Sequence, residues 1–249
     1  MTTGSVFSEL SPVLKKEKGL IRRVMAIKLR ADANPGKVKD FLAAWQETPD
    51  KAKGVLKVWT GKNIAGADWD WILDSAYDGY AGVLDFRKHP YKSVLGRYYP
   101  GGKDQVVERA LATFFKPFKQ AIPEPGIKNC VKRTLVVKVV PGAPPKLFRE
   151  FEERLAQMPV YIKGIRNWAL SHDLENHELP APKAGPDRWT HVWEQEFRTL
   201  DGFKNDYMTH PFHYGVVDPY FDPDGPICVA KGHLHAYYDI PSTILGWEK

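Results

Sequence analysis

RRVMAIKL, at residues 22–29, and KRTLVVKV, at residues 132–139, are two versions of one segment separated by 110 positions. Arg23 matches Arg133 and Lys28 matches Lys138 at this offset. Apolar and β-branched residues dominate both runs, which is typical of a strand. A segment that returns at a fixed distance indicates an internal repeat, so we compared the rest of the chain at the same offset.

The elements after the two strands repeat in the same order. Each strand is followed by a proline-marked turn and an amphipathic helix, predicted roughly over residues 35–48 and 145–158. A second strand then begins at Gly54 and at Gly164, again 110 positions apart. The two copies are therefore in step through their first three elements.

The second copy has ten more residues before its third strand. Residues 69–71 match residues 189–191 at an offset of 120, so the extra residues fall within 171–187. Proline, glycine and polar residues are frequent in that segment, and we expect a loop there. The period of two in the third strand places on one face Trp189, His191, Trp193, Gln195 and Phe197.

Both copies then reach a His-Pro pair, at His89 and at His210, and end in a further element. In the second copy this is a strand predicted over residues 227–238. In the first copy, residues 106–118 could be a short helix that passes into a strand.

Each copy thus has the order βαββ(α)β of a ferredoxin-like fold. We expect an α+β protein with one repeat over residues 20–120, a second over 127–240 and a linker at 121–126. Two four-stranded sheets packed face to face would enclose one core and cover the sheet edges, as in a dimeric α/β barrel formed within one chain.

Composition argues against several classes of protein. The net charge is +6, but the lysines and arginines form no dense block, so nucleic-acid binding is not expected. Cys130 and Cys228 are the only cysteines, which indicates neither a disulfide framework nor a cysteine metal site. No run approaches the ~20 apolar residues of a membrane span, and no signal peptide is evident at the start. We expect a soluble cytoplasmic protein; the repeat could replace a dimer interface, or two chains could form a homodimer.

The run YMTHPFH, from Tyr207 to His213, places a phenol and two imidazoles within seven residues. Pro211 fixes its own φ and disfavours the helical conformation at His210, so the run should bend there. Tyr207 and His213 could then approach each other, and a neutral imidazole beside a phenol can act as a general base. Two of these three side chains could equally be ordinary surface or core groups.

This run and the strand before it resemble a known family. THVWEQEF, at residues 190–197, followed by Tyr-x-x-His-Pro-x-His, is similar to the third strand and the following motif of the dimeric α+β barrel, or stress-responsive A/B barrel (Dabb), family. Plant olivetolic acid cyclase has the same motif, in which the tyrosine and the last histidine are the catalytic pair, with no metal or organic cofactor. The resemblance covers residues 130–240 and implies Tyr207 and His213 as catalytic residues and no cofactor here.

The first copy, over residues 20–118, resembles the family more weakly and departs from the motif at the positions equivalent to Tyr207 and His213. It has Phe86 and Lys92 instead. Phenylalanine offers no hydroxyl and an ordinary lysine is protonated, so we interpret the first copy as a structural partner. A desolvated Lys92 acting as a base or a Schiff-base amine is the alternative.

Several other side chains are candidates for contact with a substrate. Arg133 could hold a carboxylate or phenolate, or could form a structural salt bridge. His191 lies between two tryptophans on the face expected to line a cavity, and could be a ligand contact or a core histidine. The expected binding set is completed by Trp193, His210 and Tyr237, with Tyr238 as an alternative second phenol.

A metal site is a weaker hypothesis. His233-x-His235 could bind an ion together with His191 or His213, but the nearby carboxylates are not at telling spacings and the resembled family needs no metal. His172 and His177 are most simply interpreted as solvated residues of the loop.

A cavity lined by aromatic rings suits a flat phenolic ligand. The leading hypothesis is a cofactor-independent lyase or cyclase that uses His/Tyr acid-base chemistry of the aldol or retro-aldol type, including release of a small aldehyde such as formaldehyde. The alternatives are a cofactor-free monooxygenase or isomerase of aromatic compounds, and a non-catalytic stress-responsive ligand-binding protein. The sequence fixes neither the substrate nor the direction of the reaction.

Overall fold

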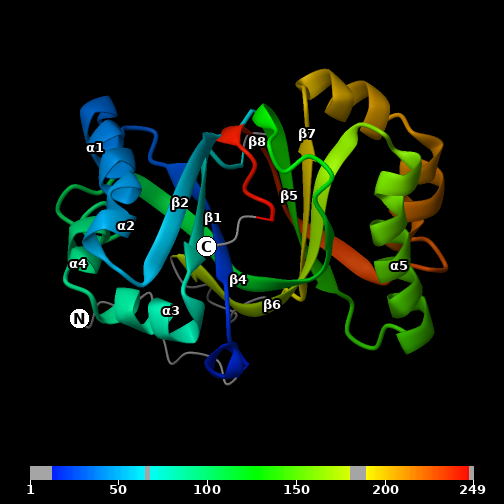
Figure 1. Cartoon of the computed structure of the whole chain (residues 1–249), viewed down its shortest axis with the longest axis horizontal. Coiled ribbons are helices and arrows are strands. Elements are labelled where there is room, and N and C mark those ends of the chain that lie inside the picture. The colour runs from blue at the N-terminus through cyan, green and yellow to red at the C-terminus, as the bar shows by residue number, and fades with distance from the viewer. Residues whose placement is uncertain (1–12, 65–67, 180–188, 247–249) are drawn as a thin grey trace. The chain divides into compact units, whose positions relative to one another are not determined.

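The computed structural model describes residues 13–64, 68–179 and 189–246 (Figure 1). These residues form two compact units. The first unit comprises residues 13–116 and 174–179, and the second comprises 117–173 and 189–246. Every helix in the described ranges is too short or too polar to cross a membrane.

The first unit follows the order predicted for one repeat. After a short 3-10 turn at Leu14–Lys16, its elements are β1 (Ile21–Leu29), α1 (Pro35–Gln46), α2 (Thr48–Lys51), β2 (Val55–Lys62), β3 (Trp71–Tyr77), α3 (Gly79–Lys88), α4 (Tyr91–Gly96) and most of β4 (Val107–Ala121). The strands are antiparallel in the order β2-β3-β1-β4.

The second unit has the same plan. Its elements are β5 (Lys128–Val139), α5 (Pro145–Tyr161), most of β6 (Ile165–Leu179), β7 (His191–Phe197), the π-helical turns η2 (Gly202–Tyr207) and η3 (His213–Val217), the 3-10 turn η4 (Asp218–Tyr220) and β8 (Ala230–Ser242). The strand order β6-β7-β5-β8 is that of the first unit, repeat for repeat.

Strand register shows that the repeat extends to single residues. Ile21 pairs with Tyr77 in the first unit, and Val131 pairs with Phe197 in the second, which keeps the offsets read from the sequence. Both second strands also carry a β-bulge in the same place, within 55–57 and within 165–167. The α+β fold built from two ferredoxin-like repeats is therefore confirmed.

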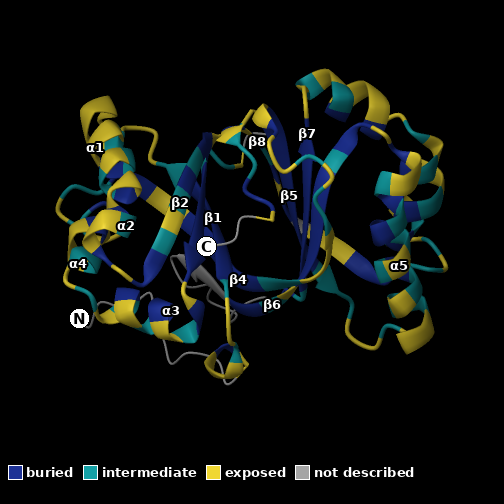
Figure 2. Ribbon diagram, in the orientation of Figure 1, coloured by how far each residue is buried: buried dark blue, intermediate teal, exposed yellow. Residues whose placement is uncertain are grey.

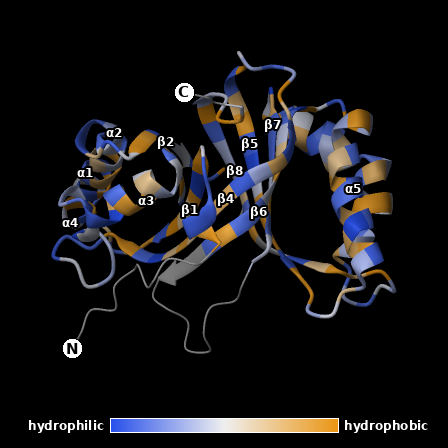
Figure 3. Ribbon diagram, turned by 60° about the horizontal axis from the view of Figure 1, so that its bottom comes forward, coloured by the Kyte–Doolittle hydropathy of each residue, from blue (hydrophilic) through white to orange (hydrophobic). Residues whose placement is uncertain are grey.

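The core of the second unit lies against α5. Phe151, Leu155 and Met158 recur at spacings of four and three and are buried, while the other side of the helix is exposed (Figure 2). Hydrophobic and hydrophilic residues are accordingly interleaved along this helix (Figure 3). The helix continues to Tyr161, one turn beyond the predicted end, and Pro159 is accommodated in that last turn.

Two predicted elements differ from the structure. Residues 171–179 belong to β6 and not to a loop. Pairing with β7 satisfies the backbone of this segment up to His172, and the Leu174 side chain packs into the core of the first unit. Residues 180–187 of the predicted loop lie outside the described residues. The run 106–118, for which the sequence allows a helix passing into a strand, lies largely in β4. Its apolar residues do not alternate because residues 110–115 of this strand are buried on both faces. The last strand of the second unit spans 230–242, a few residues later than predicted.

A close approach of two backbone segments is built into each unit. A Cβ atom at Gly164 would lie 2.7 Å from the carbonyl oxygen of Gly202 and 2.9 Å from Cβ of Asp206. Gly54 meets Gly82 in the same way in the first unit. These glycines let the turn before the second strand touch the helical segment after the third.

We therefore expect Gly164→Ala to lower the free energy of unfolding by about 1 to 3 kcal/mol, the usual effect of forcing a methyl group into a closed space. Gly215→Ala is the matched control, because no atom lies within 4 Å of its added Cβ. Urea unfolding of the two variants measures the difference. Equal stabilities would show that the backbones can separate without cost.

Candidate functional site

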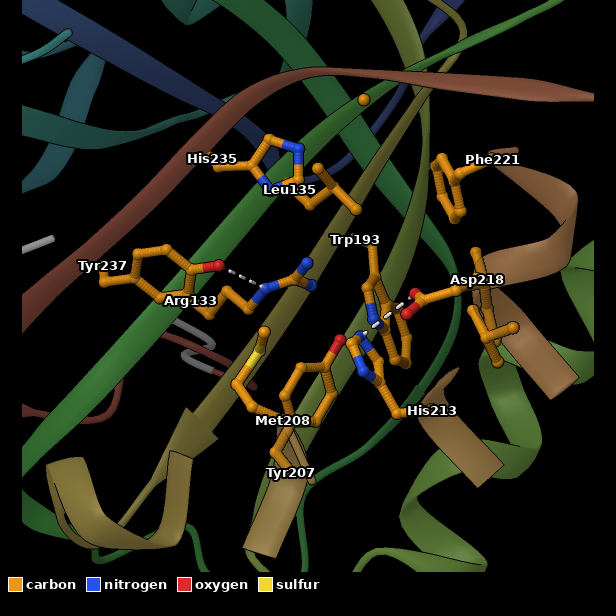
Figure 4. A pocket seen from close by; sticks show the side chains of 13 residues that line it. Arg133, Leu135, Trp193, Tyr207, Met208, His213, Asp218, Phe221, His235 and Tyr237 are labelled. Atoms are coloured by element: carbon orange, nitrogen blue, oxygen red, sulfur yellow. Dashed lines mark hydrogen bonds and ion pairs between the residues drawn. The ribbon is translucent and has the colours of Figure 1, made fainter. Parts of the chain in front are cut away.

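The second unit contains a cavity of about 280 Å³ (Figure 4). Strands, α5 and the turns after β7 all contribute to its lining, which consists of Arg133, Leu135, Leu155, Trp193, Tyr207, Met208, His213, Val217, Asp218, Phe221, Gly232, His235 and Tyr237. Ligand pockets commonly measure roughly 300 to 1,000 Å³, so this one suits a small ligand with one or two rings.

Tyr207 and His213 meet at the wall of this cavity. η2 ends at Tyr207 and η3 begins at His213, and the chain bends between them at Pro211, as expected. The ring centroids are 4.4 Å apart, and the phenol oxygen points toward the imidazole (Figure 4). Both side chains are buried. The structure thus brings together the two residues that the motif singled out.

Asp218 is a third member of this group that the sequence did not reveal. Its Oδ1 lies 3.4 Å from Nε2 of His213, and its side chain is half exposed. The two residues are five positions apart, which fits the i→i+5 geometry of a π-helical turn. Side chains that meet on a helix normally lie three or four positions apart, so the spacing of five gives no signal for this partner in the sequence.

Burial lowers the pKa of His213. The Asp218 carboxylate partly offsets this decrease, and the Arg133 cation adds to it. The imidazole is therefore neutral near pH 7 and free to accept a proton. Burial raises the pKa of Tyr207 to about 12, against the opposing effect of Arg133. The phenol keeps its proton and can donate a hydrogen bond.

Arg133 is a buried cation at the centre of the wall. Its Nη1 donates to Oε1 of Gln195 at 2.9 Å, its Nε donates to the Tyr237 hydroxyl at 3.4 Å, and its guanidinium lies 5.2 Å from the centroid of the Tyr207 ring. No carboxylate among the described side chains comes within salt-bridge distance of it. Because a buried charge without a counter-ion is costly, this wall favours an anionic group on a ligand.

The structural salt bridge considered for Arg133 occurs instead one position earlier. Lys132 Nζ lies 2.6 Å from Glu194 Oε1, and at the equivalent positions of the first unit Arg22 Nη2 lies 3.1 Å from Asp74 Oδ1. All four side chains are buried. Lys132 also donates to the hydroxyl of Tyr238. Tyr237, and not Tyr238, is the second phenol that lines the cavity, together with Tyr207.

Two predicted contact residues are absent from the cavity wall. His210 accepts a hydrogen bond at Nδ1 from the Phe212 amide, at 3.1 Å, and His89 accepts the same bond from Tyr91 in the first unit, at 3.2 Å. The His-Pro pair thus starts a turn in both repeats. His191 lies instead beside Glu152 and His172. The prediction that His172 is simply solvated is therefore incomplete, because its Nε2 lies 3.5 Å from the Glu152 carboxylate.

Among the described residues, Glu152, His172 and His191 form a group that could hold a metal ion. Although burial acts to raise it, hydrogen bonds from His172 and His191 bring the pKa of Glu152 down to about 2. His235 lines the cavity and is not part of a metal-ligating group among the described side chains. The side chains of His233 and His177 lie outside the described residues.

The first unit differs from the second at the positions of the site. Phe86 takes the position of Tyr207 and Leu73 that of Trp193, and both are packed in the core. Lys92 takes the position of His213. Burial lowers the pKa of Lys92, and the nearby Arg87 cation lowers it further. The lysine alternative therefore stays a hypothesis, and the chemical groups concentrate in the second unit.

We predict that the His213 imidazole titrates below the ordinary value of about 6.5. Asp218→Asn should lower its pKa further, since the carboxylate that stabilises the imidazolium is lost, and Arg133→Met should raise it by removing a cation. NMR of ¹³C-labelled histidine, assigned with His213→Ala, measures all three values. Titration above the ordinary value in the unmodified protein would contradict the burial seen here.

The comparisons with known proteins concern the family and the fold. The family model for the stress-responsive A/B barrel domain matches residues 131–223, a span that includes Tyr207, His213 and Asp218. No curated protein sequence matches the chain.

Solved structures resemble the chain over most of its length. An anthrone oxidase-like protein is 11% identical, with a TM-score of 0.61, over 90% of this chain and 92% of that chain. A candidate monooxygenase from Fusobacterium nucleatum subsp. nucleatum is 13% identical, with a TM-score of 0.55, over 90% and 93%. A chlorite dismutase variant from Candidatus Nitrospira defluvii is 11% identical, with a TM-score of 0.54, over 91% and 93%. At these identities the likeness concerns the fold alone. Residues 131–223 are thus similar to the stress-responsive A/B barrel family, and the chain shares the fold of the solved structures named above.

Proposed function

We propose that the second unit is a lyase or cyclase that acts on a small phenolic compound by acid-base chemistry between His213 and Tyr207, without a bound cofactor. The observation that carries this proposal is the meeting of the two rings, 4.4 Å apart, at the wall of a cavity. The aromatic lining suits a flat ring, and the volume limits the ligand to a small one.

Each polar group has a role in such a reaction. In the bond-breaking direction, His213 removes the hydroxyl proton of a hydroxymethyl group on the carbon next to a carbonyl, in the keto form of a phenol. The carbon–carbon bond breaks, an aldehyde forms, and the electron pair passes to the carbonyl oxygen. Arg133 and the Tyr207 hydroxyl stabilise the resulting phenolate, and the imidazolium returns its proton.

Asp218 supports the base in this scheme. Its carboxylate, 3.4 Å from Nε2, stabilises the imidazolium that exists only while the proton is held. The same groups in reverse order join an aldehyde or ketone carbon to an activated aromatic carbon. One mechanism therefore serves both directions.

We expect His213→Ala and Tyr207→Phe each to reduce turnover by at least ~100-fold, the scale of a general base or its partner. Substrates can be found by screening small hydroxymethyl phenols for a rise in melting temperature, then following aldehyde and ring products by mass spectrometry. Lys92→Ala, at the equivalent position of the first unit, is the control and should keep its turnover. A loss confined to Lys92→Ala would move the chemistry to the first unit.

Arg133 should select for an anionic ring substituent. We expect 4-hydroxybenzoate to bind at least ~10-fold more tightly than the neutral 4-hydroxybenzamide, since a charge-assisted hydrogen bond contributes roughly 1.5 to 3 kcal/mol. Arg133→Met should abolish this preference, and Arg23→Met, at the equivalent buried arginine of the first unit, should retain it. Calorimetric titration of both ligands measures the ratio, and an unchanged ratio in Arg133→Met would rule out this role.

A monooxygenase or oxidase of aromatic compounds is the second candidate. It is favoured by the names of two structural neighbours that cover about nine tenths of the chain, a candidate monooxygenase and an anthrone oxidase-like protein. Oxygen uptake with a phenolic substrate would support it, whereas full turnover under anaerobic conditions supports the lyase or cyclase. Ligand binding that survives both site substitutions, with no turnover in any protein, would indicate a binding protein.

A further inference from the structure

A second cluster of reactive side chains lies outside the cavity lining. His191 Nε2 and His172 Nε2 lie 3.2 Å and 3.5 Å from the same atom, Oε1 of Glu152. The three candidate ligand atoms are all within 4.8 Å of one another. Each comes from a different element of the second unit, since Glu152 is on α5, His172 on β6 and His191 on β7.

We propose that Glu152, His172 and His191 bind one divalent transition-metal ion of the zinc or ferrous iron type. Two imidazoles and one carboxylate with open positions beside them are a common ligand set for such ions. Metal bonds of ~2.0 to 2.1 Å at ordinary angles place neighbouring ligand atoms roughly 3.0 to 3.4 Å apart. The two measured separations, 3.2 Å and 3.5 Å, are close to that requirement before any ion is bound.

The surroundings of His191 hold its ring in position for this role. Its Nδ1 lies 2.8 Å from the Thr190 hydroxyl. That hydroxyl can donate to His191, or it can donate to the Val137 carbonyl, 3.2 Å away, and accept a hydrogen bond from Nδ1–H instead. In the second arrangement His191 presents a lone pair at Nε2, which is the tautomer that a metal ion needs.

The cluster is not a requirement of the fold. The first unit has Leu42, Lys62 and Trp71 at the equivalent positions. Lys62 pairs with Trp71 across its two strands just as His172 pairs with His191. The same register therefore forms without any of the three ligand types, and only the second unit carries all three at these positions.

The cluster is enclosed on some sides and open on another. Phe118 stacks on His172 with ring centroids 4.0 Å apart, and Phe148 meets the His191 ring edge-on at 5.3 Å. His191 is buried, whereas about half of the His172 side chain is exposed. The aromatic rings restrict the imidazoles, and the exposed side leaves room for water or a further ligand at the metal.

Zinc titration of the untagged protein, stripped with a chelator and dialysed, tests the proposal by calorimetry. We expect one ion per chain. His172→Ala and Glu152→Gln should each weaken binding by at least ~10-fold, and Thr190→Val by a smaller factor. The control His89→Ala should bind zinc like the unmodified protein, because His89 belongs to the first unit and caps a turn. Cobalt(II) should give a visible absorption band that His172→Ala loses.

Zinc affinity that is unchanged in His172→Ala, or lowered equally in His89→Ala, would overturn the proposal. The exposed His172 side chain makes that variant safe for folding, so the test does not depend on Glu152→Gln. No substrate is present in the titration, and His213→Ala should bind zinc normally. The metal site can therefore fail or succeed independently of the proposed acid-base function.

Discussion

Two adjacent buried cations on β5 set the character of the second unit. Because side chains alternate along a strand, Lys132 and Arg133 point to opposite faces of the sheet. Lys132 meets Glu194 on one face, whereas Arg133 meets Gln195 on the other. A glutamate at 195 would have neutralised the second cation. The electropositive wall of the cavity therefore depends on the Gln195 amide, because a carboxylate at that position would form an ion pair with Arg133. The positive charge that remains favours a ligand with an anionic group.

The two units separate what the fold needs from what a site needs. The strand order, the bulge in the second strand, the buried ion pair and the touching glycines occur in both. The cavity residues differ almost throughout. Arg23 keeps the position of Arg133, yet it contacts the sulfur of Met25 and the ring of Phe114 rather than two phenols. Features present in both units are thus structural, and those confined to the second are candidates for function.

Local features were predictable from the sequence, and contacts that depend on three-dimensional placement were not. The repeat offsets predicted the strand register, and the restriction imposed by Pro211 predicted the bend that brings Tyr207 to His213. Asp218 was missed because its π-helical spacing is not the one that helices normally show. The alternation of β7 predicts which strand face carries His191, but the composition of residues 171–187 predicts a loop where its neighbour His172 lies in a strand. Its second partner, Glu152, depends on where a separate helix lies.

Fusing two repeats in one chain has a consequence for how such a protein can evolve. When identical subunits assemble, every mutation appears twice, and a change that improves one site alters its copy as well. In this chain the two copies are encoded separately, so position 86 can be phenylalanine while the equivalent position 207 is tyrosine. The first unit can then change in ways that favour stability or another function, while the second unit keeps the residues of its site.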